Sequence, residues 1–453
     1  MTIPTLEKSD DEIGNEVAKI LSDLIRIDTS NPPGNETKAA EYLYKLMEKE
    51  GIEGEIVESA ENRGNLIVKL QGKNPGKNIM LLSHLDVVPA NPNDWKVHPF
   101  SGEIKDGFVW GRGAIDCKGL VAIQVWALLE LVKNGYQREH GDIIFVASAD
   151  EERGSTYGVK WLVENRPEIL KVDYLITEGG GFCIPINGKN KYFIEVAQKN
   201  VCWLKLKVKG RAGHGSLPGL EETSIVKASK IVEKLYKYKT PIEFHKITRT
   251  MIYEMLEKKG FIRRLLMFKP LTDRILRAYY KRDPGTAAFL NGILRDTITP
   301  TIIKGGYKEN VIPEETEITI DSRLLPGKEY KDLITHLKKA LGEKIFSQIE
   351  IEKVVVGIGS YFSEYEDNIF YNTIAEIMKE LDPKSKLVPL LITGGTDSRF
   401  FRAHGTAAFG FQPLFPDISV SEVFKMIHGI DERISIKSLV LGAKFMYKLL
   451  TSI

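Results

Sequence analysis

The sequence predicts an α/β fold in which helices flank a mostly parallel sheet, with a smaller α+β domain inserted into the chain. Three observations support this prediction. First, three apolar segments near residues 79–84, 143–149 and 173–177 each end abruptly at a histidine or an acid. Second, helical segments alternate with these strand-like segments, as in a parallel sheet with helices on both faces. Third, from about residue 198 apolar and polar residues alternate, as in a half-exposed antiparallel strand.

The first part of the chain supplies the elements of the parallel sheet. Residues 10–27 and 36–51 have helical spacing and are joined by a turn rich in proline and glycine. Residues 102–119 predict a short hairpin and a glycine-rich turn, which lead into a long amphipathic helix at residues 120–135. Active sites in such sheets lie beyond the carboxyl ends of the strands, which is where the acids of this sequence occur.

The middle of the chain predicts the inserted domain. A strand near residues 201–210 is followed by a helix (222–238), a long insertion (about 243–300), a strand (316–327), another helix and a last strand near residues 347–357. After about residue 360 the α/β pattern returns. We therefore predict one domain in two parts, residues 1–197 and 358–453, split by an inserted domain at residues 198–357.

The composition is that of an ordinary globular protein. The 453 residues are 43% hydrophobic and 27% charged with a net charge of +2, which predicts no nucleic-acid partner. The apolar segments are shorter than the ~18 residues of a membrane span, and three cysteines with an acidic N-terminal segment favour a cytoplasmic protein. A basic segment at residues 261–282 predicts a pair of amphipathic helices packed on the inserted domain, with a membrane, substrate or partner surface as the alternative.

Polar side chains collect where the strand-like segments end. They are His84, Asp86, Asp116, Glu151, Glu152 and Glu178, with His428 in the C-terminal part. Singly, a histidine at a strand end is more often a satisfied polar residue than a ligand, and an acid after a strand often caps the next helix. Together, two histidines and three acids would suffice for two zinc-like cations that share one carboxylate bridge. Such a pair can hold a hydroxide and a substrate carbonyl together.

Other catalytic patterns are missing from the sequence. None of the eight histidines belongs to the HExxH motif of single-zinc, thermolysin-like enzymes. No GxSxG motif indicates a serine α/β-hydrolase, and no GxGxxG motif opens a first strand–helix unit as in dinucleotide enzymes. The metal cluster is therefore the strongest chemical signal.

Eight motifs occur in a fixed order along nearly the whole chain: SHLDVVP, HPFSGEIKDGFVWGRGAIDCKG, SADEERGS, LITEGGG, GRAGHGSLP, NVIPEETEITIDSRLLPG, GGTDSRFF and IHG. In this order they resemble the co-catalytic zinc amidohydrolases, the family of aminoacylase, acetylornithine deacetylase, succinyl-diaminopimelate desuccinylase and the glutamate carboxypeptidases. The insertion ahead of NVIP is most similar to the carboxypeptidase S-like branch. The resemblance implies a zinc exopeptidase-like catalytic domain (residues 1–197 and 358–453) and a lid and dimerisation domain (198–357).

The resemblance also implies a role for each polar residue of the catalytic domain. His84 and Glu178 would hold one metal, Glu152 and His428 the other, and Asp116 would bridge them. Asp86 would hydrogen-bond the free nitrogen of His84 and fix its orientation. Glu151 would be the general base and then acid. A cis peptide bond is expected between Asp116 and Cys117, and we interpret Cys117 itself as a packing residue.

Five further residues match substrate-binding positions of the family. His214 matches a residue that reaches into the partner's site in family dimers and stabilises the developing oxyanion. Asn310 and Arg323 match lid residues that hold the free carboxylate of the substrate, a task suited to the planar arginine fork. Gly395 and Thr396 match a catalytic-domain loop at the same end of the substrate. Taken alone, His214 is more readily interpreted as a structural histidine at a strand end, and Arg323 as part of a surface ion pair.

The resemblance implies a hydrolase that cleaves the amide bond of a peptide C-terminus, a dipeptide or an N-acyl amino acid with a free α-carboxylate. A hydroxide held by two divalent ions, zinc or else cobalt or manganese, would attack the carbonyl, and the protein would be a homodimer through its lid. One alternative is a co-catalytic zinc aminopeptidase, which recognises a free amine. The other is an inactive homologue that binds a ligand.

Overall fold

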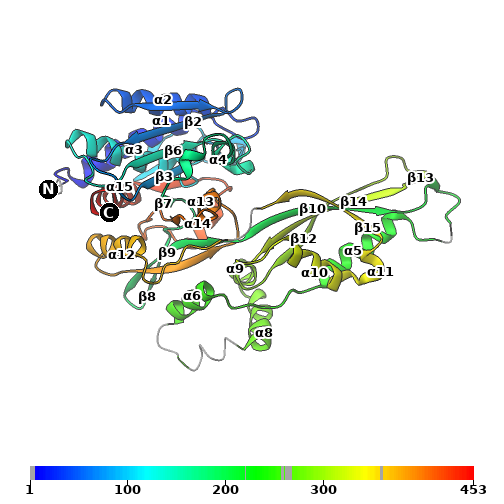
Figure 1. The fold of residues 1–453 in the computed structure, drawn as a ribbon. Helices are drawn as coiled ribbons and strands as arrows, with labels where there is room; N and C mark the ends of the chain where they lie inside the picture. Colours follow the sequence, from blue (N-terminus) through cyan, green and yellow to red (C-terminus); the bar gives the residue numbers. More distant parts are fainter. Residues whose placement is uncertain (1–5, 220, 257–259, 261–267, 358–360) are drawn as a thin grey trace. The chain divides into compact units, whose positions relative to one another are not determined.

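The computed structural model describes residues 6–219, 221–256, 260, 268–357 and 361–453. Two compact units divide the chain. The first comprises Met1–Val196, Ser363–Leu390 and Thr396–Ile453, and the second comprises Ala197–Phe362 and Leu391–Gly395. Figure 1 shows the helices and strands of both units, each of which is described by itself below.

The first unit contains a nine-stranded sheet in the order β1-β2-β6-β3-β7-β17-β9-β16, with β8 paired to β9. Its four central strands, β6, β3, β7 and β17, run parallel, which confirms the predicted parallel sheet. Antiparallel strands flank them on both sides. The strands are β1 (Gly54–Glu58), β2 (Gly64–Leu70), β3 (Ile79–His84), β6 (Ile143–Ser148), β7 (Tyr174–Thr177), β8 (Cys183–Ile186), β9 (Lys189–Gln198), β16 (Ser385–Ile392) and β17 (Ala407–Gly410).

Helices cover both faces of this sheet. They are α1 (Asp10–Arg26), α2 (Glu36–Glu48), α3 (Lys118–Lys133), α4 (Val159–Asn165), α12 (Ile369–Leu381), α13 (Ser398–Arg402), α14 (Val420–Met426) and α15 (Ile436–Ser452), with 3₁₀ turns η1 (Pro92–Asp94), η2 (Glu151–Arg153) and η3 (Pro167–Leu170). α3 is apolar around nearly its whole circumference because it packs against β3 and against α1 and α15 (Figure 1). On β3, Met80 and Leu82 pack with α4 and α13, whereas Ser83 on the opposite face hydrogen-bonds Gln124 of α3.

A small three-stranded sheet joins two distant parts of the first unit. The predicted hairpin forms β4 (Ile104–Lys105) and β5 (Phe108–Trp110), and β18 (Arg433–Ser435) pairs with β5. The glycine-rich turn before α3 therefore lies beside the segment that follows His428.

The second unit is a four-stranded antiparallel sheet in the order β12-β14-β10-β15, with helices on one face. Alternate residues of β10 are buried in one core with residues of α5 and α10, as the alternating sequence predicts, and β14 shows the same alternation. Its elements are β10 (Asn200–Lys209), β11 (Gly213–His214), α5 (Ser224–Lys237), α6 (Lys246–Leu256), α8 (Lys269–Tyr280), α9 (Pro284–Leu294), β12 (Thr297–Gly305), β13 (Val311–Ile312), β14 (Glu315–Leu324), α10 (Tyr330–Leu341), α11 (Glu343–Phe346) and β15 (Ile349–Val356).

The predicted insertion contains an additional strand and one helix of the basic segment. Its last residues begin the edge strand β12, which the sequence did not predict. Within the basic segment at residues 261–282, α8 forms as expected, and residues 261–267 lie outside the described residues. Across the described ranges, no helix combines the length and the apolar character that crossing a membrane requires.

Candidate metal centre

Three parallel strands bring the predicted residues to one edge of the first unit's sheet. β3 ends at His84, and Glu178 directly follows β7. Glu151 and Glu152 begin the 3₁₀ turn η2 after β6. Because the carboxyl ends of neighbouring parallel strands meet at the same edge, these side chains converge although 94 positions separate the first from the last in the sequence.

Asp116 lies at the centre of the cluster. Its Oδ1 atom is 3.1 Å from Nε2 of His84, and its Oδ2 atom is 3.2 Å from Nε2 of His428. Each histidine has a second acid beside it: Glu178 Oε2 lies 3.6 Å from His84 Nε2, and Glu152 Oε2 lies 3.0 Å from His428 Nε2. The cluster therefore consists of two sets of three side chains that share the carboxylate of Asp116.

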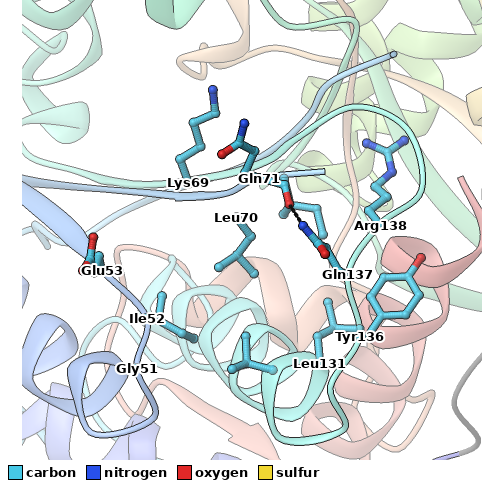
Figure 2. Close-up of a pocket in the computed structure, with 12 residues that line it drawn as sticks. Gly51, Ile52, Glu53, Lys69, Leu70, Gln71, Leu131, Tyr136, Gln137 and Arg138 are labelled. Carbon is cyan, nitrogen blue, oxygen red and sulfur yellow. Dashed lines mark hydrogen bonds between the residues drawn. The ribbon is translucent and has the colours of Figure 1, made fainter. Parts of the chain in front are cut away.

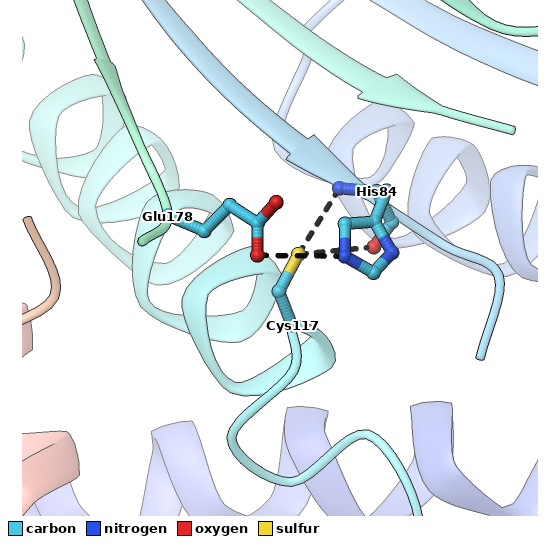
Figure 3. A group of neighbouring side chains, drawn as sticks. All are labelled: His84, Cys117 and Glu178. Atoms are coloured by element: carbon cyan, nitrogen blue, oxygen red, sulfur yellow. Dashed lines mark hydrogen bonds and ion pairs between the residues drawn. The ribbon is translucent and has the colours of Figure 1, made fainter. Parts of the chain in front are cut away.

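Cys117 lies against the first of these sets, as Figure 3 shows. The peptide bond between Asp116 and Cys117 is cis, as the resemblance implies. The Cys117 thiol accepts a hydrogen bond from the backbone N–H of His84 (3.1 Å) and donates to its carbonyl (3.4 Å). Burial raises the pKa of this thiol to about 12, so it remains protonated, whereas the thiolate is the form that binds metals.

The pKa values of Glu178, Glu152 and both histidines of the cluster are raised, the acids by burial and the histidines by the neighbouring acids. Burial and the neighbouring Asp116 raise the pKa of Glu178 to about 7, and burial also raises the pKa of Glu152. Hydrogen bonds to Asp116 and Glu152 raise the pKa of His428 to about 10. Burial by itself would lower the pKa of His84, but the surrounding acids raise it well above its ordinary value. Without other cations, protons on these groups must balance the buried negative charge.

The residues of the cluster fit a pair of divalent cations. Imidazole nitrogens and carboxylate oxygens are the donor atoms that zinc and similar ions use. Within the described part of the chain, nothing hydrogen-bonds the buried Oε1 atom of Glu152. A buried carboxylate oxygen without a donor is unfavourable unless a cation approaches it.

Asp86 contacts His84 through its backbone carbonyl and, at longer range, through its carboxylate. The nearest acceptor for Nδ1 of His84 is the backbone carbonyl of Asp86 at 2.9 Å, whereas its carboxylate is 3.5 Å away. The carboxylate also accepts the backbone N–H groups of Glu151 (3.1 Å) and Glu152 (3.2 Å) and the side-chain amide of Asn31 (2.8 Å). Asp86 therefore holds the turn that carries both glutamates.

A second layer of buried polar residues supports the same turn, and the sequence did not reveal it. Asp150, in a left-handed conformation with φ 63°, accepts hydrogen bonds from Asn31 (2.9 Å) and Arg63 (2.8 Å). Arg63 also donates to Glu36 at 2.8 Å. Asn31 and Glu36 belong to a stretch that reads as a surface turn, and nothing local to Arg63 distinguishes it from an exposed arginine.

The predicted substrate residues of the second unit fall into two groups. His214 is exposed on β11, beside the backbone of Asn310, whose carbonyl accepts the N–H of Gly215 at 2.8 Å. Arg323 lies near the far end of β14, roughly 25 Å along the strand direction from the β11–β13 pair. Its guanidinium donates to both carboxylate oxygens of Asp321, at 2.7 and 3.0 Å.

The loop after β16 carries the last two predicted residues. Gly395 ends the second unit and Thr396 resumes the first. Thr396 is buried, and its hydroxyl lies 2.6 Å from that of Ser398. The next residue, Asp397, hydrogen-bonds Ser155 just beyond η2, so this loop is tied to the turn of Glu151 and Glu152.

A pocket of about 300 Å³ lies elsewhere in the first unit. Figure 2 shows residues that line it, among them Lys69 and Leu70 at the end of β2. Its lining also includes Ile143, the first residue of β6, whereas Glu151 and Glu152 follow the last residue of that strand. Three of its polar side chains pair within the protein: Gln137 donates to the carbonyl of Gln71, Arg138 to that of Lys77, and Lys69 pairs with Asp142. We therefore do not assign the chemistry to this pocket.

Comparisons with known proteins agree with the resemblance in the motifs. Residues 80–452 match the family described as Peptidase family M20/M25/M40. The chain is 28% identical over 437 residues to the human N-fatty-acyl-amino acid synthase/hydrolase PM20D1, covering 93% of this chain and 84% of that protein. It is 28% identical over 389 residues to the probable carboxypeptidase S-like 2 of Dictyostelium discoideum, covering 83% and 71% of the two chains. Among solved structures, the M20 family metallo-carboxypeptidase Sso-CP2 from Sulfolobus solfataricus has the same fold, with a TM-score of 0.72, 20% identity and coverage of 96% and 98%.

Proposed function

The chain belongs to peptidase family M20/M25/M40 and is a metallopeptidase or amidohydrolase, and we propose that it hydrolyses the amide bond between an acyl group and an amino acid with a free α-carboxylate. The observation that carries this proposal is the position of Asp116, whose two oxygens separately face His84 and His428. Such a carboxylate is suited to bridge two cations, and paired cations are suited to amide hydrolysis.

We propose that two divalent ions bind in the cluster. His84, Asp116 and Glu178 would hold one, and His428, Asp116 and Glu152 would hold the other. When bound, the ions would lower the pKa of a shared water and polarise the carbonyl of the substrate. Zinc suits this donor set, and cobalt and manganese are compatible with it.

Glu151 is the residue that we propose moves the proton. Its backbone N–H is held by Asp86, and its neighbour Glu152 contacts His428, so the two adjacent glutamates have separate partners. Burial and the nearby Glu178 raise the pKa of Glu151 well above its ordinary value. A carboxylate of that kind can accept a proton from water and then donate it to the leaving nitrogen near neutral pH.

We propose that Arg323, Asn310, Gly395 and Thr396 bind the α-carboxylate end of the substrate and that His214 stabilises the oxyanion. The separation of Arg323 from His214 and Asn310 within the second unit supports a homodimer. One copy would supply Arg323 to its own site, and the other would supply His214 and Asn310. The dimer can be tested by refolding a mixture of His214→Ala and Glu151→Gln chains, because mixed dimers would contain one intact site. Absence of recovered activity would favour sites built from a single chain.

N-acyl amino acids are the substrate class that we favour, since the relative matched over 93% of this chain is named as an N-fatty-acyl-amino acid enzyme. Dipeptides and peptide C-termini are the second candidate, favoured by the carboxypeptidase S-like relative. All three cysteines are free and buried, which supports the reducing cytoplasm that we propose as the location.

The function can be tested with metal-free protein that is reloaded with zinc, cobalt or manganese. We expect close to two ions per chain and hydrolysis of N-acyl amino acids or dipeptides, but not of amino-acid amides, which lack the carboxylate. Preference for the amides would instead indicate an aminopeptidase, and a fully loaded protein without turnover would indicate a binding homologue. Asp116→Ala should lose affinity for both ions at once. Glu130→Gln, which changes a buried acid near the other end of α3, should still bind both ions.

A further inference from the structure

Glu432 is a buried carboxylate that touches none of the proposed metal ligands through their side chains. It lies between His428 and β18, and its carbonyl accepts the N–H of Gly111 at 2.9 Å. Its Oε1 atom accepts the backbone N–H groups of Ile115 (2.8 Å) and Asp116 (3.1 Å). Its Oε2 atom accepts the N–H of Gly113 at 3.0 Å. One carboxylate thus holds three backbone amides of the turn that ends at Asp116.

Arg112 completes this arrangement by reaching in the opposite direction. Its Nη1 atom donates to Oε2 of Glu432 at 2.7 Å, and its Nη2 atom donates to the carbonyl of Gly429 at 2.7 Å. Gly429 directly follows His428, which has a positive φ of 56°. A Cβ atom at Gly429 would lie 1.9 Å from the carbonyl oxygen of Lys425. The backbone at Gly429, whose carbonyl accepts this hydrogen bond, is therefore closely packed.

The ion pair of Glu432 and Arg112 connects the two segments that carry Asp116 and His428. These residues are 312 positions apart in the sequence, and both belong to the set of side chains that includes Glu152. The contacts of the pair go to the backbone of the two ligand-bearing segments. By contrast, His84 and Glu178 are positioned by β3 and β7, and Asp116 is the one member of their set that contacts this pair.

Stability alone is a weak explanation for this ion pair. Replacing a buried ion pair with apolar residues is often neutral or stabilising, because desolvation offsets the attraction between the charges. Backbone hydrogen bonds to a charged acceptor, however, are short and directional. This pair is thus better suited to setting a geometry than to adding stability.

We propose that Glu432 and Arg112 are positioning residues that set the separation of Asp116 and His428, and thereby the affinity of the subsite formed with Glu152 for a divalent ion. This inference rests on the proposed two-metal function. Glutamine at position 432 would offer one oxygen in place of two and would turn its NH₂ group toward backbone N–H donors. Changes in groups that orient metal ligands typically reduce metal affinity by about 10- to 100-fold.

The experiment is a titration of metal-free protein with Co²⁺, followed by calorimetry and by the visible absorption of the bound ion. Wild-type protein should take up two ions in resolvable steps. Glu432→Gln should weaken one step by about 10- to 100-fold and the other by less. His428→Ala identifies the step that belongs to its subsite. If the pair acts through that subsite, the double variant should lose little more affinity there than His428→Ala alone.

Glu130→Gln is the matched control. Glu130 is also a buried acid in an ion pair, with Lys8 at 2.7 Å, and it lies roughly 18 Å along α3 from Lys118. This variant should keep both binding steps even if its thermal unfolding midpoint falls as far as that of Glu432→Gln. Equal losses of Co²⁺ affinity in both variants would make the effect a general result of destabilisation and would overturn the proposal.

The remaining outcomes separate this inference from the proposed function. Two normal steps in both wild type and Glu432→Gln would overturn the positioning role and leave the two-metal function standing. Fewer than two ions in wild type would overturn both. If Glu432→Gln does not fold, Arg112→Lys serves in its place, since lysine can pair with Glu432 but cannot also reach Gly429 with a planar fork. An unchanged subsite affinity in Arg112→Lys would equally refute the proposal.

Discussion

Asp86→Asn is expected to lower kcat without removing metal, because of how the Asp86 carboxylate is used. It accepts hydrogen bonds from the backbone N–H groups of Glu151 and Glu152 and from Asn31. His84, by contrast, is oriented chiefly by the backbone carbonyl of residue 86, at 2.9 Å, which the substitution retains. The variant should therefore disturb the turn of the general base more than the first metal ligand.

The size of the expected loss in kcat follows from the number of hydrogen bonds that an asparagine at this position can still accept. Asparagine has one oxygen, which can keep the bonds from Asn31 and Glu152 if it occupies the position of Oδ2. In wild type the backbone N–H of Glu151 donates to Oδ1 of Asp86 at 3.1 Å. In the variant the NH₂ group of asparagine takes the place of Oδ1, so this one hydrogen bond to a charged acceptor is lost. Such a bond contributes about 1.5–3 kcal/mol. If that loss falls on the placement of Glu151, kcat drops by about one to two decades.

The assay compares kcat, KM and metal content of wild type and Asp86→Asn after loading with zinc. We expect close to two ions, a nearly unchanged KM and the reduced kcat. Asp142→Asn is the matched control, because Asp142 also accepts a backbone N–H, from Gly72 at 3.0 Å, at the opposite end of β6; it should leave kcat unchanged. If Asp86→Asn instead loses an ion while its loaded fraction turns over normally, the carboxylate orients His84 after all and this reasoning is wrong.

Three further predictions concern the same chemistry. Glu151→Gln should retain two ions yet lose more than the ~10²–10⁴-fold of an ordinary acid–base group, whereas Glu152→Gln should lose metal first and recover partly at high zinc; the reverse pattern of metal contents would exchange their roles. Arg323→Lys should lower kcat/KM by about one to two decades, and esterifying the substrate carboxylate should cost wild type as much but the variant little more; additive losses would refute the contact. The pKa of His428 is raised from 6.5 to about 10 in the metal-free protein, so its protonation stabilises the fold fully below pH 6.5, and this contribution disappears as the pH rises through about 10. Zinc uptake at pH 7–8 should therefore release protons, measured in weakly buffered titrations, and an uptake without proton release would contradict the raised pKa.

The sequence by itself determined the local elements and the identity of the candidate ligands. Short apolar runs that stop at His84, Asp150 and Glu178 predicted strands, because such runs are typical of strands buried on both faces of a parallel sheet. Because parallel strands run in the same direction, their carboxyl ends lie at the same edge of the sheet, and the polar residues that follow them come together there. The alternation in β10 likewise predicted a strand with one buried face. Each of these inferences depends on neighbours close in the chain.

Only the tertiary structure decided which atoms meet. The two oxygens of Asp116 face His84 and His428 separately, and the Asp86 carboxylate accepts backbone amides. Both arrangements depend on how closely separate segments of the chain approach one another. The supporting residues Arg63 and Glu432 were hidden for the same reason, since their partners lie 87 and 316 to 320 positions away in the sequence. A buried charge is stable only beside its partners, and packing of distant segments is what brings those partners together.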